Sequence, residues 1–214
     1  MQNRRTLREQ IVACLRAGDF SGLVALAGQD AGVARQLLAL LFAPDELLHW
    51  RAVEGLGQVA GAQPGQVQKL IGRLLYSLNE DSGSFGWGAA AALGEIGRHQ
   101  LPLVADIVPM FCGLLEQSFS QAQMLWGIGR FGEMHPDRLG EVLPCVLPCL
   151  SSPDPLVRAL AAWSLGKSGY RPAESAIRSL VRDESPVELY DGGEVRRTTV
   201  GQVAQEALAA LEDN

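Results

Sequence analysis

The chain has 214 residues, and its 18 lysines and arginines against 24 aspartates and glutamates give a net charge of −6. Apolar residues make up 47% of it, which is typical of a globular protein and excludes intrinsic disorder. The acidic balance argues against electrostatic capture of nucleic acid or of an anionic membrane. The longest apolar run, residues 37–43, is far below the roughly 20 residues of a spanning helix, and residues 1–20 never build an apolar stretch of the length expected in a signal peptide. We therefore expect a cytoplasmic protein without membrane contact.

A pattern recurs along the chain after the first 30 residues, which we expect to form one or two capping helices. Five segments end alike, in WRAVEGLGQVA, WGAAAALGEIG, AQMLWGIGRFG, ALAAWSLGKSG and QVAQEALAALE. Their central apolar residues are Leu56, Leu93, Ile128, Leu165 and Leu208, at intervals of 37, 35, 37 and 43 residues. Periods of this size are typical of a helical solenoid.

Small residues flank each central apolar residue. Glycine follows it directly in four of the five segments, at Gly57, Gly94, Gly129 and Gly166. Glycine inside a helix costs about 0.5–1 kcal/mol relative to alanine. A cost repeated in four units predicts a packing role, namely close approach of the next helix.

Each of these helices is preceded by another apolar-periodic segment. These segments are residues 33–43, 67–78, 104–115, 139–150 and 173–181. Most lead into a short break such as APDE at residues 43–46 or SSPDP at residues 151–155, where Pro and Asp favour a turn and a helix start. The repeating unit is therefore predicted to be a helix A, a turn and a helix B.

The ALGEIG and SLGKSG endings resemble HEAT-like repeats of the kind also found in phycobilisome lyases, over about residues 31–213. NEDSGSFGWG at residues 79–88 and a C-terminal hairpin are similar to features of bacterial HEAT-like proteins. The resemblance implies a right-handed α-α superhelix that acts as a scaffold. The resemblance to phycobilisome lyases also allows a role in the assembly or maturation of another protein, although no residue in this sequence supports that role.

The B helices of such a superhelix line its concave face, where ligands usually bind. Trp126 and Trp163 occupy the same position in adjacent repeats, so we expect them to be neighbours. Tryptophan and arginine are enriched among binding hot spots. The candidate partner-binding residues are Trp126, Trp163, Arg130, Lys167, Glu95 and Glu54. Two alternatives stay open: the tryptophans are core, and the row Glu95, Arg130 and Lys167 is a solvated ladder of ion pairs.

The segment 79–88 departs most from a plain repeat. Glu80 and Asp81 are interpreted as helix-start acids rather than cation ligands, and Trp87 is expected to pack between repeats. Its glycines lack the GxxxxGK[ST] pattern of a phosphate loop.

The last repeat carries an insertion around Asp191-Gly192-Gly193, a strong hairpin signal. Thr199 and Gln202 form a capping box for the final helix. The hairpin is interpreted either as a cap on the end of the solenoid or as a recognition edge presenting Tyr190, Arg196 and Arg197.

Catalytic and metal chemistry finds little support in the residues. No His-Glu dipeptide supports a di-iron hydroxylase of the deoxyhypusine type, and the histidines are scattered singly. The cysteines contain no CxxC pattern, so we expect no metal, no cofactor and no disulfide. Trp126, Trp163, Glu95 and Arg130 also resemble the base-binding set of HEAT-like DNA glycosylases, although only two lysines are available to hold phosphates.

The sequence thus predicts an all-α, HEAT-like solenoid with a small β-hairpin insertion, as a single domain over residues 1–214. Residues 1–30 form the N-terminal cap, residues 31–183 the helical repeats, and residues 184–214 the hairpin and the C-terminal capping helix. The predicted function is non-catalytic binding of a protein or peptide. The alternative is a DNA-binding or glycosylase-type protein; the oligomeric state is left open.

Overall fold

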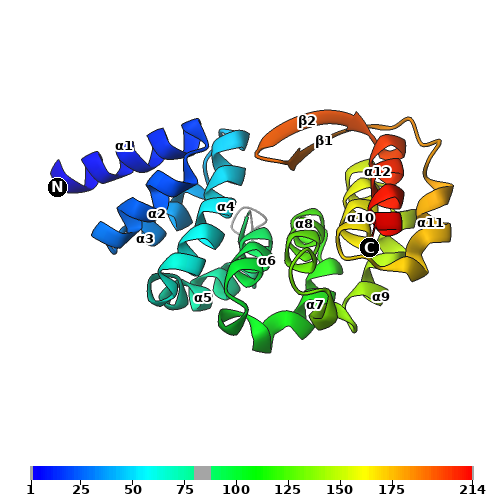
Figure 1. Cartoon of the computed structure of the whole chain (residues 1–214), viewed down its shortest axis with the longest axis horizontal. Helices are drawn as coiled ribbons and strands as arrows, with labels where there is room; N and C mark the ends of the chain where they lie inside the picture. The colour runs from blue at the N-terminus through cyan, green and yellow to red at the C-terminus, as the bar shows by residue number, and fades with distance from the viewer. Residues whose placement is uncertain (1, 80–87, 214) are drawn as a thin grey trace. The chain divides into compact units, whose positions relative to one another are not determined.

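The computed structural model describes residues 2–79 and 88–213 of the chain. These residues form α-helices α1 to α12, five short 3-10 helices and one β-hairpin (Figure 1). The all-α fold class with a hairpin near the C-terminus is therefore confirmed. The fold divides into two compact units: unit 1 comprises residues 1–104 and 192–194, and unit 2 comprises residues 105–191 and 195–214. The single continuous domain expected from the sequence remains a prediction.

Unit 1 begins with two helices before the first repeat, as predicted. Its helices are α1 (Gln2–Ala17), α2 (Phe20–Gln29), α3 (Val33–Leu40), α4 (Glu46–Ala62), α5 (Pro64–Leu78) and α6 (Ala89–His99), followed by the 3-10 turn Leu101–Leu103. Asp45 in the APDE break caps α4, because its Oδ1 accepts a hydrogen bond of 3.0 Å from the backbone N–H of Leu48. Residues 80–87 lie outside the described residues. The roles predicted for Glu80, Asp81 and Trp87 fall in this segment.

Unit 2 has short and irregular A helices. They are the 3-10 turn Ala105–Met110 with α7 (Phe111–Leu115), the 3-10 turn Pro136–Leu139 with α9 (Leu143–Val146) and the turn Leu147–Ser151, and the turn Arg171–Ala173 with α11 (Glu174–Ser179). Pro109, Pro144 and Pro148 interrupt these segments because proline lacks the N–H that an α-helix needs. The B helices stay regular as α8 (Gln121–Gly132) and α10 (Pro155–Lys167), and α12 (Val200–Asp213) follows the hairpin. Figure 1 shows α12 beside α10, and the two pack together closely.

Glycines on the B helices lie where the next helix comes closest, as their spacing predicts. A Cβ atom added to Gly129 on α8 would lie 3.1 Å from Cα of Ser164 on α10. One added to Gly166 on α10 would lie 2.7 Å from Cα of Ala207 on α12. These backbones approach too closely for a larger residue, which explains why the sequence accepts the cost of glycine in a helix.

The central apolar residues are buried in the first four repeats, at Leu56, Leu93, Ile128 and Leu165. In the fifth repeat the central residue is less buried: Leu208 is half-exposed, whereas Val203 is completely buried. The repeat alignment still holds in α12, because Gly166 meets Ala207, one residue before Leu208, just as Gly129 meets Ser164, one residue before Leu165.

The hairpin forms as predicted, from β1 (Pro186–Asp191) and β2 (Glu194–Thr199). Gly192 and Gly193 have φ values of +61° and +86°, the left-handed conformation that a two-residue hairpin turn requires. The capping box is also confirmed, because Thr199 and Gln202 exchange hydrogen bonds of 3.2 Å between side chain and backbone N–H in both directions.

Candidate binding site on helices α8 and α10

Trp126 on α8 and Trp163 on α10 lie side by side in unit 2. Their ring centroids are 6.3 Å apart and their planes are inclined by only 11°. This confirms that the shared repeat position makes the two indoles neighbours. We call these two residues, together with the strand that covers them, the aromatic site.

Strand β1 covers both indoles. The ring of Tyr190 lies 6.1 Å from that of Trp126, and Trp126 Nε1 donates a hydrogen bond of 2.8 Å to the backbone carbonyl of Tyr190. Trp163 Nε1 donates to Oδ2 of Asp191 over 3.4 Å. The exposed fractions of Trp126 and Trp163 are therefore only 1% and 4%.

The prediction that Trp126 and Trp163 are accessible to a partner is thus wrong for this structure. The alternative, that the two tryptophans are buried, is confirmed. The physical cause is the insertion of the last repeat, which folds back onto the B helices of its own unit. Tyr190, which the sequence offered as an exposed recognition residue, is itself 1% exposed. The two candidate sites of the sequence are therefore one cluster, in which the strand occupies the place expected for a ligand.

The two cations beside the tryptophans lie where they were expected. The guanidinium carbon of Arg130 is 5.4 Å from the ring centroid of Trp126, and Lys167 Nζ is 5.5 Å from that of Trp163, both within cation–π range. Glu133 links them, with Oε1 2.9 Å from Lys167 Nζ and Oε2 3.6 Å from Arg130 Nη1. Glu133 could not be singled out from the sequence, because it stands outside the repeated pattern of the B helices.

Four charged residues of the hairpin take part in ion pairs: Glu188, Asp191, Arg196 and Arg197. Arg196 is paired with Glu206 on α12 and lies 3.8 Å from Oδ2 of Asp191. Its hydrogen bond to Glu206 raises the pKa of Arg196. Arg197, by contrast, is 89% exposed, and it pairs with Glu188 across the hairpin. Of the three hairpin residues predicted for recognition, Arg197 is exposed, Arg196 is half-buried and Tyr190 is buried.

Glu54 and Glu95, predicted to add specificity, are buried helix residues of unit 1, with exposed fractions of 7% and 0%. Oε1 of Glu95 lies 3.1 Å from Nε2 of His99 and 3.6 Å from Nη1 of Arg98, on its own helix. The prediction of an accessible row of Glu95 with the two cations is therefore wrong. The small residues of α4 and α6 bring neighbouring helices so close that even their polar positions are enclosed.

The base-binding alternative finds no support in this geometry. Its two tryptophans are covered by β1, and Arg130 is engaged with Glu133. A flipped base needs an open pocket between such side chains.

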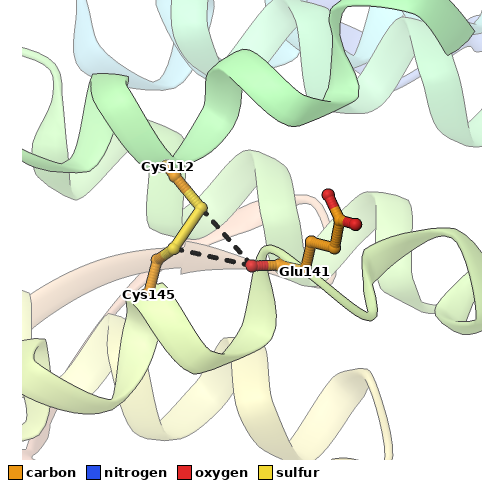
Figure 2. The surroundings of a disulfide bond; sticks show 3 residues. All are labelled: Cys112, Glu141 and Cys145. Carbon is orange, nitrogen blue, oxygen red and sulfur yellow. Dashed lines mark hydrogen bonds between the residues drawn. A yellow bond between two sulfur atoms is a disulfide. The ribbon is translucent and has the colours of Figure 1, made fainter.

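Two cysteines form a disulfide, which corrects the expectation of none. Cys112 on α7 and Cys145 on α9 are bonded, with their Cα atoms 5.6 Å apart (Figure 2). The bond joins the A segments of consecutive repeats across 33 residues, and both cysteines are half-buried. No CxxC pattern signals a pair so far apart in sequence, because only the stacking of repeats brings these residues together.

The backbone carbonyl of Glu141 lies beside this disulfide, 3.5 Å from Sγ of Cys112 and 3.6 Å from Sγ of Cys145 (Figure 2). Sulfur atoms joined in a disulfide have no hydrogen to donate. The carbonyl can therefore accept a hydrogen bond from either cysteine only when the pair is reduced. Cys14 and Cys149 are not bonded to another cysteine, and burial raises the pKa of both thiols.

Within residues 2–79 and 88–213, no three His, Cys, Asp or Glu side chains converge as metal ligands would. None of the helices in these ranges combines the length and apolar character that a bilayer span demands.

Comparisons with known proteins agree with this repeat architecture. Residues 120–189, about a third of the chain, match the family described as HEAT repeats. The chain is 27% identical over 173 residues to an uncharacterised protein of Archaeoglobus fulgidus, a match that covers 80% of this chain and 93% of that protein.

Two engineered proteins of known crystal structure have a similar fold. One has a TM-score of 0.57 at 19% identity, over 98% of this chain and 88% of the engineered one. The other has a TM-score of 0.54 at 18% identity, over 97% of this chain and 53% of the engineered one, so the present chain spans about half of its length. The family match over residues 120–189, the stacked helix pairs and the glycines at their contacts together show that the chain has a HEAT-like repeat fold.

Proposed function

We propose that this protein is a non-catalytic scaffold that binds an extended segment of another protein at the aromatic site of α8 and α10. The observation that carries the proposal is the hydrogen bond from Trp126 Nε1 to the carbonyl of Tyr190. It is a contact to the backbone of an extended strand, which any peptide offers whatever its sequence. Helices α8 and α10 thus already hold an extended segment, which belongs to the same chain.

A partner segment binds in place of β1. Trp126 donates to its backbone, and the stacked indoles receive an aromatic or aliphatic side chain where Tyr190 now lies. Helix α10 packs against α8 and α12, and α8 packs also against α7. These helices need no reordering, so binding loses little conformational entropy. The hairpin must first leave, which lowers the apparent affinity in proportion to the fraction of molecules that are open.

The cytoplasmic location remains a prediction, and the disulfide argues against it. Disulfides are rare in the cytosol because glutathione and thioredoxin keep thiols reduced. The redox state of Cys112 and Cys145 in the cell is therefore a direct indicator of the compartment.

The test uses the full chain and a labelled peptide with the sequence of residues 184–192, which contains β1. In a loosened variant, Leu189→Ala with Tyr190→Ala, the resident strand loses two buried side chains. We expect this variant to bind the peptide saturably in fluorescence polarisation. The wild type should bind it about tenfold or more weakly, because its own strand competes at millimolar effective concentration.

The matched control is the same peptide with alanine at the position of Tyr190, which should bind the loosened variant more weakly than the unaltered peptide does. Circular dichroism confirms that the variant keeps its helices. A folded loosened variant that does not bind the peptide would overturn the proposal.

A further inference from the structure

A groove of about 880 Å³ lies in unit 1 between α3 and α5. Its lining comes from one face of each segment: Arg35, Leu38, Ala39 and Phe42 on one side, and Arg73 and Tyr76 on the other. The first four recur at the i, i+3, i+4 and i+7 spacing of a single helical face, and Phe42 follows just after α3 ends. Gly72 leaves the α5 side open, since a Cβ added there would meet nothing within 4 Å.

The groove contains both of the large apolar side chains that are exposed among the described residues of unit 1. Phe42 is 47% exposed and Tyr76 is 68% exposed, and among the described residues only Met110 and Met134, both in unit 2, are comparable. Exposed apolar side chains that gather in one groove, instead of being scattered singly, are typical of an interaction surface.

The charge of the groove is opposite to that of the chain. The protein has a net charge of −6, yet the charged residues lining the groove are Arg35 and Arg73, both exposed. No carboxylate of residues 2–79 or 88–213 forms an ion pair with either guanidinium. Two arginines beside an apolar floor attract an acidic partner and repel a basic one.

We propose that this groove binds an acidic amphipathic helix of a partner protein. Phe42 lies seven positions after Arg35, which corresponds to about 10 Å along a helix, or two helical turns. A helix of that length presents apolar side chains at i, i+3 or i+4, and i+7 to Leu38, Phe42 and Tyr76. Carboxylates on its flanks then face the two arginines. The groove lies in the other unit, so this inference does not depend on the aromatic site.

The test titrates the full chain into two labelled helical peptides of about three turns. Both carry leucines at i, i+4 and i+7, and they differ only in having glutamate or lysine at every flanking position. We expect saturable binding of the glutamate peptide and affinity at least about tenfold weaker for the lysine peptide. Arg35→Glu combined with Arg73→Glu should reverse this preference, and Tyr76→Ala should weaken binding of the glutamate peptide by about tenfold.

The matched control is Arg138→Glu combined with Arg182→Glu, which makes the same charge change at exposed positions of unit 2. It should leave the preference of the wild type unchanged. Equal binding of both peptides, binding of neither, or a preference that survives reversal of Arg35 and Arg73 would each overturn the proposal. All the altered side chains are exposed, so the variants are expected to fold, as thermal unfolding would verify.

Discussion

The indole N–H of Trp126 donates a hydrogen bond over 2.8 Å to the backbone carbonyl of Tyr190, 64 residues further along the chain. This bond joins a B helix of the repeat array to the insertion in the last repeat. It makes one cluster out of two features that are separate in sequence. The hairpin therefore packs on the B helices, with β1 covering the indoles of α8 and α10.

Replacing Trp126 by alanine should destabilise the protein strongly. Truncation of a buried tryptophan costs about 3–5 kcal/mol in free energy of unfolding, and this change also removes the donor to the Tyr190 carbonyl. Urea denaturation measures the loss. Arg197→Ala is the control, because that side chain is 89% exposed and its removal should stay within about 0.5 kcal/mol of wild type. Equal stabilities of the two variants would show that the indole is not buried.

Two glycine-to-alanine changes should have opposite effects. A Cβ at Gly129 would lie 2.3 Å from Cζ3 of Trp163 and close to the α10 backbone, so Gly129→Ala should cost about 1–3 kcal/mol as the helices move apart. Gly72→Ala meets no neighbour within 4 Å and should stabilise α5 by about 0.5–1 kcal/mol. Thermal unfolding of the two variants measures both changes in stability. If Gly129→Ala were also stabilising, α8 and α10 would not be in close contact.

Breaking the disulfide should also reduce stability. The bond closes a loop across 33 residues, and in the chain-entropy model its loss costs about 3–4 kcal/mol. Cys112→Ser combined with Cys145→Ser is the test, and Cys14→Ser is the control that leaves the bond intact. Alkylation under denaturing conditions provides an independent measurement: purified protein should take up two iodoacetamide groups without reductant and four with it. Four groups without reductant would show that the pair is not bonded.

Acidification should weaken the fold through His49. This side chain is buried, its Nδ1 lies 2.6 Å from the carbonyl of Leu41, and burial lowers its pKa. The unfolded chain takes up this proton near pH 6.5, whereas the folded chain does so only at lower pH. Between these two values the unfolded state binds more protons, so stability falls as the pH falls below about 6.5 and is unaffected by His49 above it.

Urea denaturation between about pH 7 and pH 5 measures this dependence. His49→Gln should flatten the slope, and His135→Gln, the control, should retain the slope of the wild type. An unchanged slope in His49→Gln would mean that His49 is not the group that titrates.

Much of the fold could be predicted because it depends on local sequence patterns. The recurring small residues predicted the close helix contacts at Gly129 and Gly166, and the Asp-Gly-Gly turn and the Thr199–Gln202 box predicted the hairpin and the start of α12. The partial exposure of Leu208 on α12 could not be predicted, because the repeat spacing does not say how α10 and α11 pack against that helix.

The candidate site could be predicted only in part. Repeat spacing correctly placed Trp126 beside Trp163 and a cation beside each. Periodicity describes how helices stack, but it gives no information on where an insertion folds. Periodicity therefore could not predict that Tyr190 covers the indoles, nor that Cys112 and Cys145 form a disulfide.

The most direct test of the aromatic site is a ¹⁵N NMR spectrum of the Trp126 indole N–H. In the wild type this N–H donates a hydrogen bond to the Tyr190 carbonyl. In the variant with Leu189→Ala and Tyr190→Ala the strand is loosened, so the resonance of the N–H should shift. Adding the peptide of residues 184–192 to that variant should return the resonance to its wild-type position, because the peptide takes the place of β1. A resonance that stays shifted while the peptide binds would place the binding elsewhere and contradict the proposed function.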